Sequence, residues 1–423
     1  MSRPYGLLGR HLGHTYSPIV HRELAGLEFV KFEREPEDFE AFLRGDEWEG
    51  LNVTLPYKQE AAKVCDRLTP LAERLGNVNT ITRTEDGELL GDNTDYVGFM
   101  TMAETLGIEL EGIKAVVFGG SGGAGSTVID MLEHLGAKPV SISRKGPDNY
   151  GNLERHADAK LAVNCTPVGM YPNCPASVCS LESFPELEGF MDATYNPART
   201  GLYMQAEQMG IPRASGMLML VAQAAATDEI FTGDPISLPR VFDITARLSA
   251  TEQNIALMGL PGSGKTVVGE ELARIMGRRH VDINHALEMK LGMKGVDYIR
   301  KYGEESFRLE ETELLEEVSK RSRLVISCTN GTIMREENYP LLHQNSLIVF
   351  LNRPLEKLYI HGHQLAGSDE LERYAQQTTV KILEWADYSV DSFDSIEQTA
   401  QGVLNTLPVM LVDDDEEEEW GPH

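Results

Sequence analysis

The sequence predicts an α/β protein built on parallel sheets. Apolar segments of strand length alternate with amphipathic, helix-like segments along the chain, for example AVVFG, then TVIDMLEHL, then PVSIS. Two glycine-rich stretches, GGSGGAG from residue 119 and GLPGSGK from residue 259, each follow such an apolar segment and precede a helical pattern. A strand, a glycine-rich turn and a helix in succession form the unit from which nucleotide-binding α/β domains are built.

Composition and charge limit the classes of partner. The chain has 423 residues, 41% hydrophobic and 25% charged, as in ordinary globular proteins, and its length suits about two to three domains. Its net charge of −28 argues against a nucleic-acid partner, because a phosphate backbone calls for excess lysine and arginine. No apolar run approaches the ~20 residues of a membrane span, and the start lacks a signal peptide's apolar stretch. We therefore expect a cytoplasmic protein with free thiols and no membrane partner; its oligomeric state is left open.

Two segments mark expected boundaries. Residues 234–253 contain two prolines and weaker patterning, which predicts a domain junction just before a new strand–helix unit. Residues 409–423 include seven consecutive acidic side chains, from Asp413 to Glu419. Because a run of like charges cannot bury itself, we predict a disordered, solubilising tail there.

The first glycine-rich stretch has the spacing of a dinucleotide site. Gly120, Gly122 and Gly125 form a G-x-G-x-x-G pattern directly after AVVFG. Such glycines allow a tight turn and a close approach of backbone to pyrophosphate at a helix N-terminus. The next apolar segment, PVSIS, leads into Arg144 and Lys145, where an NAD-binding chain often has an acidic residue. Two cations favour a 2′-phosphate and hence NADP; the alternative is a solvated loop with surface basic residues.

Polar clusters interrupt the apolar segments upstream of that loop. They are GHTYSP (13–18), NVTLPYK (52–58), GNVNT (76–80) and GDNTD (91–95). Hydroxyls, amides, one lysine and one aspartate at strand ends suit a small polyhydroxylated ligand in a cleft. A Lys–Asp pair can also pass a proton to the oxygen of a carbonyl that is attacked by hydride. Each cluster taken alone is also compatible with ordinary turn chemistry.

Together, the ordered motifs resemble the shikimate dehydrogenase family over about residues 4 to 235. The matching stretches are GHTYSP, NVTLPYK, GNVNT, GDNTD, GGSGGAG, SRK, NCTPVGM, DATYNP and MLVAQAA. The resemblance implies a substrate domain (1–98), a Rossmann-like NADP domain (99–215) and a helix (about 216–233) that returns to the substrate domain. The implied activity is the reversible, NADPH-dependent reduction of 3-dehydroshikimate to shikimate.

The resemblance also implies roles for individual residues. Lys58 would be the catalytic acid/base and Asp95 its partner, which also touches substrate. Thr15 and Ser17 would bind the substrate carboxylate, and His14 is interpreted as a structural residue beside them. The other implied substrate ligands are Thr54, Asn79, Tyr195 and Gln223. The implied NADP ligands are Gly120, Ser121, Gly122, Gly123, Ala124, Ser143, Arg144 and Lys145, with Gly216 near the nicotinamide.

Two departures from the family pattern affect specificity. Thr15 replaces the usual serine, and its added methyl narrows the carboxylate pocket, so shikimate and quinate both stay open as substrates. The basic patch, usually Asn-Arg-Thr, is Ser143-Arg144-Lys145 here. It keeps the arginine, and NADP with it.

The second glycine-rich stretch has a complete Walker A context. Gly259 and Gly264 bracket the loop, and Lys265-Thr266 opens the following helix. The backbone of Gly262, Ser263 and Gly264 would cradle the phosphates of ATP or ADP, Lys265 would reach the β- and γ-oxygens, and Thr266 would ligate Mg²⁺.

From about residue 254 to 408 the chain resembles the shikimate kinase family through VDIN, GEESFRLEE and EWADYSVD. The family's Asp-x-Asp is Asp282-Ile283-Asn284 here, and its triple glycine is Thr329-Asn330-Gly331. The lid HGHQLAGSDELER retains only Arg373, although the substrate-anchoring Arg308 is present. These losses predict a domain that keeps its phosphate cradle without kinase activity. Two alternatives stay open: a bifunctional dehydrogenase–kinase, and a ligand-sensing regulator built from pathway enzymes.

Overall fold

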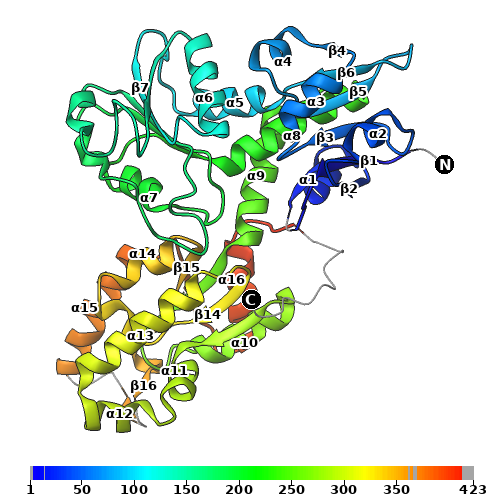
Figure 1. Ribbon diagram of the computed structural model, residues 1–423. Coiled ribbons are helices and arrows are strands. Elements are labelled where there is room, and N and C mark those ends of the chain that lie inside the picture. The colour runs from blue at the N-terminus through cyan, green and yellow to red at the C-terminus, as the bar shows by residue number, and fades with distance from the viewer. Residues whose placement is uncertain (1–2, 14, 361–362, 365–368, 412–423) are drawn as a thin grey trace.

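The computed structural model describes residues 3–13, 15–360, 363–364 and 369–411 (Figure 1). These residues form three sheets of five or six strands and a two-stranded ribbon. We call the part built on the first sheet the first lobe, the part built on the second sheet the second lobe, and the part built on the third sheet the third domain. The α/β fold class predicted from the sequence is confirmed.

The first lobe contains a six-stranded sheet in the order β2-β1-β3-β5-β6-β4. Its strands are β1 (Tyr5–Gly9), β2 (Phe29–Glu33), β3 (Leu51–Val53), β4 (Arg67–Leu68), β5 (Thr80–Arg83) and β6 (Leu89–Asp92). Its helices are α1 (Ser17–Ala25), α2 (Phe39–Arg44), α3 (Lys58–Val64) and α4 (Pro70–Leu75). The expectation of purely parallel sheets is wrong here, because β5 runs antiparallel to both β3 and β6. A short turn over residues 84–88 joins β5 to β6, as an antiparallel pair allows, whereas a longer segment with α3, β4 and α4 separates β3 from β5.

The second lobe contains a five-stranded parallel sheet in the order β11-β10-β9-β7-β8. Its strands are β7 (Lys114–Phe118), β8 (Lys138–Ile142), β9 (Leu161–Asn164), β10 (Gly189–Asp192) and β11 (Arg213–Ser215). Its helices are α6 (Gly123–His134), α7 (Gly201–Gln208), η1 (Leu153–His156) and η2 (Leu181–Ser183). The strand order reverses beside β7, and ligands of open α/β sheets bind at such a reversal, beyond the carboxyl ends of the strands.

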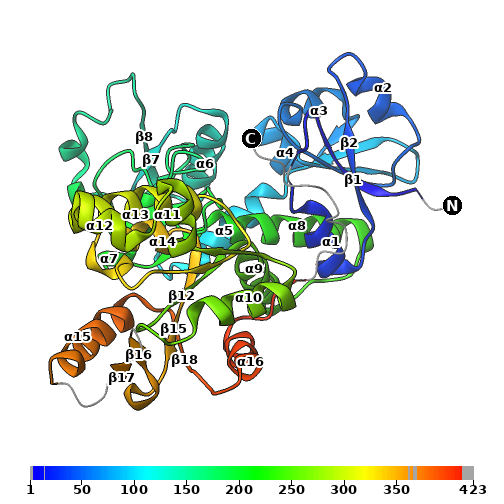
Figure 2. The same cartoon turned by 90° about the horizontal axis from the view of Figure 1, so that it is seen from below.

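Two helices join the lobes. α5 (Asp95–Thr105) leads out of the first lobe, α8 (Gly216–Thr232) returns to it, and they pack side by side between the two sheets (Figure 2). Gly98 permits this packing, since a Cβ there would lie 2.5 Å from the carbonyl oxygen of Met219. The predicted domain limit at 98/99 falls inside α5, and the domain limits stay a prediction.

The third domain contains a parallel sheet in the order β13-β14-β12-β15-β18. Its strands are β12 (Asn254–Met258), β13 (Arg279–Asp282), β14 (Leu324–Ser327), β15 (Ser346–Asn352) and β18 (Tyr388–Asp391), with a ribbon of β16 (Tyr359–Ile360) and β17 (His363–Gln364). Its helices are α10 (Lys265–Met276), α11 (Ile283–Leu291), α12 (Gly295–Tyr302), α13 (Glu304–Ser319), α14 (Asn338–His343), α15 (Asp369–Trp385), α16 (Ile396–Thr406), η3 (Thr332–Met334) and η4 (Leu355–Lys357).

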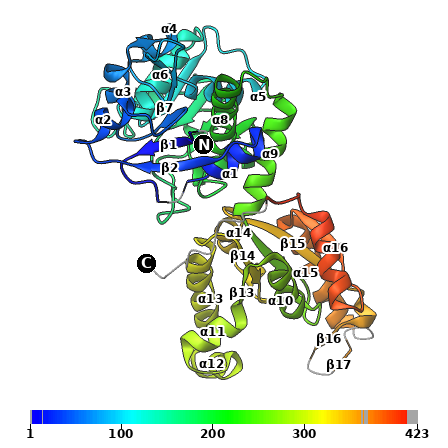
Figure 3. The ribbon, with the colours of Figure 1, turned by 90° about the vertical axis from the view of Figure 1, so that its right-hand side faces the viewer.

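The weakly patterned junction is a helix, α9 (Leu238–Glu252), which runs from the first lobe into the third domain (Figure 3). Pro239 lies in its first turn, where the missing N–H costs no intrahelical hydrogen bond. Val241, Ile244 and Leu248 recur at helical spacing and are buried with residues of both lobes. The prolines therefore start the helix instead of preventing one.

The end of the described chain returns to the first core. Leu411 is buried in the cluster that includes the apolar face of α9, and its N–H donates to Thr251 Oγ1 at 2.8 Å. The remainder of the predicted acidic tail, 412–423, lies outside the described residues. Within the described part of the chain, no helix combines the length and apolarity needed to cross a bilayer.

A buried contact between a histidine and an aspartate ties α8 to α1. His21 Nδ1 lies 2.5 Å from Asp228 Oδ1, and neither side chain is exposed. His21 Nε2 lies 3.0 Å from Asn52 Oδ1. The Asn52 amide nitrogen already donates to Asn79 O and to Thr80 and Thr227 hydroxyls, so its oxygen faces the histidine, which must donate from Nε2.

Asp228→Ala is expected to lower the free energy of unfolding by about 1–3 kcal/mol, because it leaves the buried His21 Nδ1 without its hydrogen-bond partner. The matched control is Asp297→Ala, which removes the exposed pair with Arg300 and should cost no more than about 0.5 kcal/mol. Urea unfolding followed by circular dichroism measures both. Equal midpoints for the two variants would contradict a structural role for the buried pair.

Candidate active site and nucleotide loops

Lys58 and Asp95, predicted as a proton-transfer pair, meet at the start of two helices. Lys58 opens α3 and Asp95 opens α5, and Lys58 Nζ donates to Asp95 Oδ2 at 2.7 Å. Their side chains are 28% and 17% exposed, so the pair is partly desolvated but still accessible. A lysine in this setting can give a proton to a developing alkoxide, with Asp95 holding the ammonium in place.

Asn79 fixes the orientation of Asp95. Its amide nitrogen donates to Asp95 Oδ1 at 3.0 Å and approaches Gln223 Oε1 at 3.3 Å. Its oxygen accepts the N–H of Thr94 at 2.7 Å, which determines which end of the amide faces the carboxylate. One Asp95 oxygen is thus held by Asn79 and the other by Lys58. Four predicted site residues share one hydrogen-bonded group.

Sequence reasoning missed the buried residues that support this group. Thr227 on α8 bonds through its hydroxyl to Asn52 on β3 (3.0 Å), to Thr80 on β5 (3.1 Å) and to Thr94 before α5 (3.0 Å). All four side chains are buried. Their polar spacing is visible in NVT, GNVNT and GDNT, but nothing local in the sequence shows that Thr227 joins them.

The other predicted substrate residues approach from separate elements. Thr15 Oγ1 donates to Ser17 Oγ at 3.2 Å and accepts the Ser17 N–H at 3.3 Å, so these two form a second group. Thr54 follows β3 and donates its N–H to Leu8 O at 2.9 Å. Tyr195 is 37% exposed on the loop after β10, which leaves its ring accessible to a ligand. His14 lies outside the described residues.

The predicted dinucleotide loop has the close packing that requires glycine. A Cβ at Gly120 would lie 2.5 Å from Ser141 Oγ, and one at Gly125 would lie 2.3 Å from the oxygen of Gly119. The loop joins β7 to α6, whose first residue is Gly123, and the neighbouring Ser121, Gly122 and Ala124 are exposed. An exposed glycine loop at a helix N-terminus beside the strand-order reversal fits a pyrophosphate.

The predicted 2′-phosphate residues follow β8. Arg144 and Lys145 are exposed, and Ser143 Oγ donates to Lys145 O at 3.1 Å, which shapes the turn. Gly216, predicted near the nicotinamide, opens α8. A Cβ there would lie 2.3 Å from Ala193 O, so only glycine allows this helix to start against the loop after β10.

In the third domain, the Walker A lysine, Lys265, donates hydrogen bonds to other residues of the same domain. Gly262 and Gly264 adopt φ values of +80° and +94°, which favour glycine. Lys265 Nζ donates to Gly259 O at 2.9 Å and to Asn330 Oδ1 at 2.9 Å. Burial lowers the pKa of Lys265 to about 8. Lys265 is therefore mostly positively charged at neutral pH, but its ammonium already donates hydrogen bonds within the domain.

The predicted magnesium residue contacts the retained aspartate. Thr266 Oγ1 donates to Asp282 Oδ2 at 2.6 Å, and Asp282 Oδ1 accepts the His285 N–H at 2.9 Å. A hydroxyl and a carboxylate are oxygen ligands that suit Mg²⁺. Ser263, within the loop, is buried, and Asn284, in place of the second aspartate, is exposed.

Arg308, predicted as the substrate anchor, also forms ion pairs within the domain. It donates to Glu311 Oε2 at 2.8 Å and to Glu304 Oε1 at 3.1 Å. Glu311 is fully buried and also accepts the Thr329 hydroxyl. A Cβ at Gly331 would overlap the Arg308 guanidinium, so the remaining glycine of the motif makes room for it. Of the predicted lid, residues 361–362 and 365–368 lie outside the described residues.

Two family models match the chain. The shikimate dehydrogenase substrate binding domain matches residues 7–81, and shikimate kinase matches residues 261–378. The first range contains Lys58 and Asn79, and the second begins inside the Walker A loop and contains Arg308.

Individual relatives match the two lobes. The shikimate dehydrogenase (NADP(+)) of Methanosarcina barkeri is 33% identical over 265 residues, 55% of this chain and 94% of the relative. Two solved structures share 30% identity and cover 58% of this chain. One is a chorismate mutase/shikimate 5-dehydrogenase fusion protein from Clostridium acetobutylicum (97% of that chain, TM-score 0.54). The other is shikimate 5-dehydrogenase from Thermus thermophilus in complex with NADP(H) and shikimate (99%, TM-score 0.51).

These matches cover the lobes that carry the Lys58–Asp95 pair and the dinucleotide loop, and separately the domain that carries the Walker A loop. The chain belongs to the shikimate dehydrogenase family, and that part is fused to a C-terminal domain of the shikimate kinase family.

Proposed function

We propose that the chain catalyses the reversible, NADP(H)-dependent interconversion of 3-dehydroshikimate and shikimate, and that its third domain is inactive as a kinase. The observation that carries the first part is the partly exposed Lys58–Asp95 pair, held by Asn79 in a chain of this family. NADPH, when bound, supplies the hydride.

The residues of the first lobe handle the proton and the substrate. Lys58 gives its proton to the oxygen of the reduced carbonyl, and Asp95 keeps the ammonium directed at that oxygen. Asn79 holds Asp95, Gln223 contacts Asn79, and both amides offer further polar groups to ring hydroxyls. Thr15 and Ser17 bind the carboxylate through hydroxyl and backbone donors. Tyr195 completes the site from the second lobe.

The residues of the second lobe fit NADP. The loop from Gly120 to Ala124 offers its amides to the pyrophosphate, and Gly216, packed against the backbone of Ala193, sets the start of α8 beside the nicotinamide. Arg144 binds the 2′-phosphate, since its guanidinium is exposed at the end of β8, where the ribose of a dinucleotide lies in this type of domain.

Internal contacts of the third domain support its lack of kinase activity. Asn330 replaces a glycine of the family motif and accepts a hydrogen bond from Lys265, so it competes with a phosphate for the ammonium. Glu311 and Glu304 occupy Arg308, which would otherwise meet a substrate carboxylate. Phosphoryl transfer depends on positioned positive charge, and both of these cations have partners within the domain.

Lys58→Ala and Asp95→Ala are each expected to lower kcat by about 10²–10⁴-fold, because a positioned proton donor is worth that much. NADPH oxidation with 3-dehydroshikimate measures the effect, with quinate and NAD⁺ as alternative substrate and cofactor in the reverse direction. Lys63→Ala, an exposed lysine on the same helix, is the control and should keep wild-type turnover. Near wild-type turnover in either active-site variant would remove the proton-transfer role.

Arg144→Ala is expected to raise KM for NADP⁺ by about ten- to hundredfold, since a charged contact to phosphate contributes roughly 1.5–3 kcal/mol. KM for NAD⁺ should stay nearly unchanged, because NAD⁺ lacks the 2′-phosphate. Initial rates with shikimate and each cofactor measure the two values. Equal losses for both cofactors would place the phosphate contact elsewhere.

The third domain is expected to bind ADP weakly through Lys265 and to form no shikimate 3-phosphate from ATP. Because only protonated Lys265 holds a phosphate, ADP affinity should fall by close to tenfold as pH rises from 7 to 9, through the pKa of about 8. Calorimetric titration measures the affinity, and Lys265→Ala should abolish its pH dependence. Asn330→Gly should tighten binding by freeing the ammonium.

Shikimate 3-phosphate formed by the wild type and abolished by Lys265→Ala would establish a bifunctional enzyme instead. ADP affinity that is the same at pH 7 and pH 9 would show that Lys265 does not hold the phosphate.

A further inference from the structure

Arg199 lies on the loop after β10 in the second lobe, and its side chain enters the third domain. Its guanidinium donates to the carbonyl oxygens of His343 (2.7 Å) and Ser346 (3.3 Å) and lies 3.9 Å from Asp387. The side chain is only 17% exposed. Beside it, His343 Nε2 lies 2.6 Å from Glu207 on α7. Because a largely buried guanidinium is costly to leave without partners, these contacts bind the loop firmly to the third domain.

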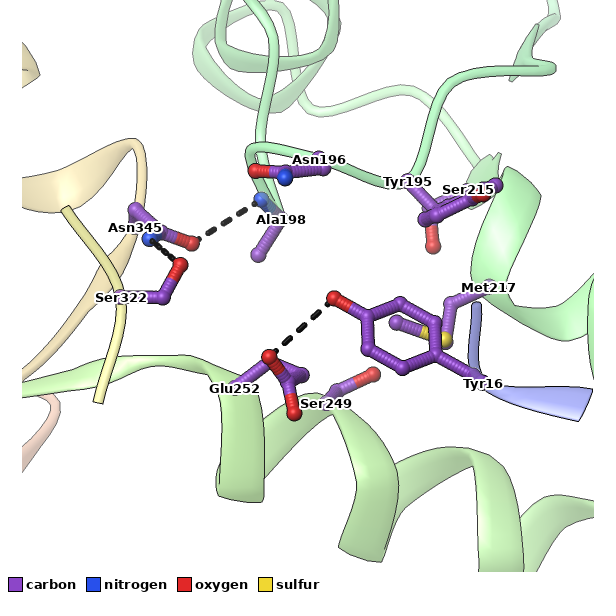
Figure 4. Close-up of a pocket in the computed structure, with 10 residues that line it drawn as sticks. All are labelled: Tyr16, Tyr195, Asn196, Ala198, Ser215, Met217, Ser249, Glu252, Ser322 and Asn345. Atoms are coloured by element: carbon purple, nitrogen blue, oxygen red, sulfur yellow. Dashed lines mark hydrogen bonds between the residues drawn. The ribbon is translucent and has the colours of Figure 1, made fainter. Parts of the chain in front are cut away.

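The backbone of the same loop also donates hydrogen bonds to the third domain. The Arg199 N–H donates to Gln344 O at 2.9 Å, and the Ala198 N–H donates to Asn345 Oδ1 at 3.3 Å (Figure 4). Both acceptors belong to the turn between α14 and β15. Two consecutive amides of the second lobe therefore have their hydrogen bonds in the third domain.

The same loop carries Tyr195 and touches the start of α8. The Tyr195 ring lies edge-on to Tyr16, with 5.8 Å between the ring centroids. The Gly216 N–H donates to Thr194 O at 3.1 Å, and a Cβ on Gly216 would meet Ala193 O. A shift of this loop would therefore move a predicted substrate ligand and the predicted nicotinamide position together.

The third domain is also fixed to the first lobe, through α9. The apolar face of α9 is buried in the core shared by the two lobes, and Arg247 on α9 lies 3.4 Å from Glu23 on α1. The Tyr16 hydroxyl donates to Glu252, the last residue of α9, at 3.1 Å. The third domain is thus tied to both lobes, to one through the Arg199 loop and to the other through α9 (Figure 1).

We propose that Arg199 is a positioning residue for the dehydrogenase reaction: by entering the third domain it fixes the loop that carries Tyr195 and supports the start of α8. In this role the third domain holds the second lobe's part of the substrate site, the Tyr195 loop and the start of α8, in position. This role requires no phosphoryl transfer. This inference rests on the proposed dehydrogenase function, because it assigns Tyr195 to substrate binding.

The kinetic test uses the full chain with Arg199→Ala. Its KM for shikimate should rise by about two- to tenfold, the cost of ordering a released loop and side chain on binding. KM for NADP⁺ should stay within twofold, because the loop reaches only the nicotinamide end of the cofactor, near Gly216, while the pyrophosphate loop and Arg144 lie on other connections. Arg199→Lys keeps the charge and should restore part of the shikimate KM. Arg247→Ala, an arginine at the other domain contact, is the control and should leave both KM values unchanged.

A double-mutant cycle with Tyr195→Phe separates positioning from general destabilisation. If Arg199 acts through Tyr195, Arg199→Ala should raise KM for shikimate much less in the Tyr195→Phe background than in the wild type. A merely structural arginine would give independent, multiplying effects and would lower the melting temperature without this coupling. Multiplying effects would overturn the proposal.

Amide hydrogen exchange tests the anchoring without any turnover. Arg199→Ala should accelerate exchange in a peptide covering 194–199, and Arg247→Ala should not. Unchanged exchange there would overturn the proposal even if KM changed. A wild-type chain that shows no turnover with shikimate would refute the proposed function, and the exchange result would still decide whether Arg199 holds the loop.

Discussion

The geometry of the candidate active site depends on one buried hydroxyl, that of Thr227. It bonds to side chains on β3, β5 and the segment before α5, and so joins the returning helix α8 to the sheet of the first lobe. Buried polar groups are costly unless all of their bonds are made, so this network has one satisfied arrangement and few tolerable variations. Asn79, itself buried, links this network to the partly exposed Asp95. The network therefore restricts the position of the Asp95 carboxylate, which orients Lys58.

Much of this was predictable from local pattern. The two glycine-rich loops and their helices follow from spacing and residue type, because a strand–turn–helix unit is encoded by neighbouring residues, whereas the pairing of Lys58 with Asp95 was implied by the family resemblance. The predicted junction at 234–253 hid a helix, because its prolines lie at the start, where they do no harm. The antiparallel β5 was also missed: its pairing with β3 joins segments distant in sequence, although its pairing with β6 is a local hairpin. The contacts of Arg199 could not be predicted from the sequence, because it resembles any arginine of a surface loop. Its hydrogen-bond partners lie about 145 residues later in the chain.

The third domain keeps the fold of its family, while its phosphate loop and its cations differ in what determines them. Its loop glycines keep the backbone shape that cradles phosphates, because positive φ values at Gly262 and Gly264 are properties of the chain alone. The cations Lys265 and Arg308 differ in this respect, because whether they can bind a ligand depends on the side chains that contact them. Asn330 meets Lys265, and two glutamates meet Arg308. Cations satisfied from within stabilise the fold, while a catalytic site needs them poised for a ligand.

Leu411 has a consequence for the order in which the molecule is made. Its side chain completes the core shared by the two lobes, although it follows the whole third domain in the chain. Domains generally fold as they leave the ribosome, N-terminal part first. Here the dehydrogenase part emerges early but keeps an open apolar site until residue 411 has been synthesised, more than 150 residues after α9 ends. The first part therefore reaches its final packing only after the third domain has been translated.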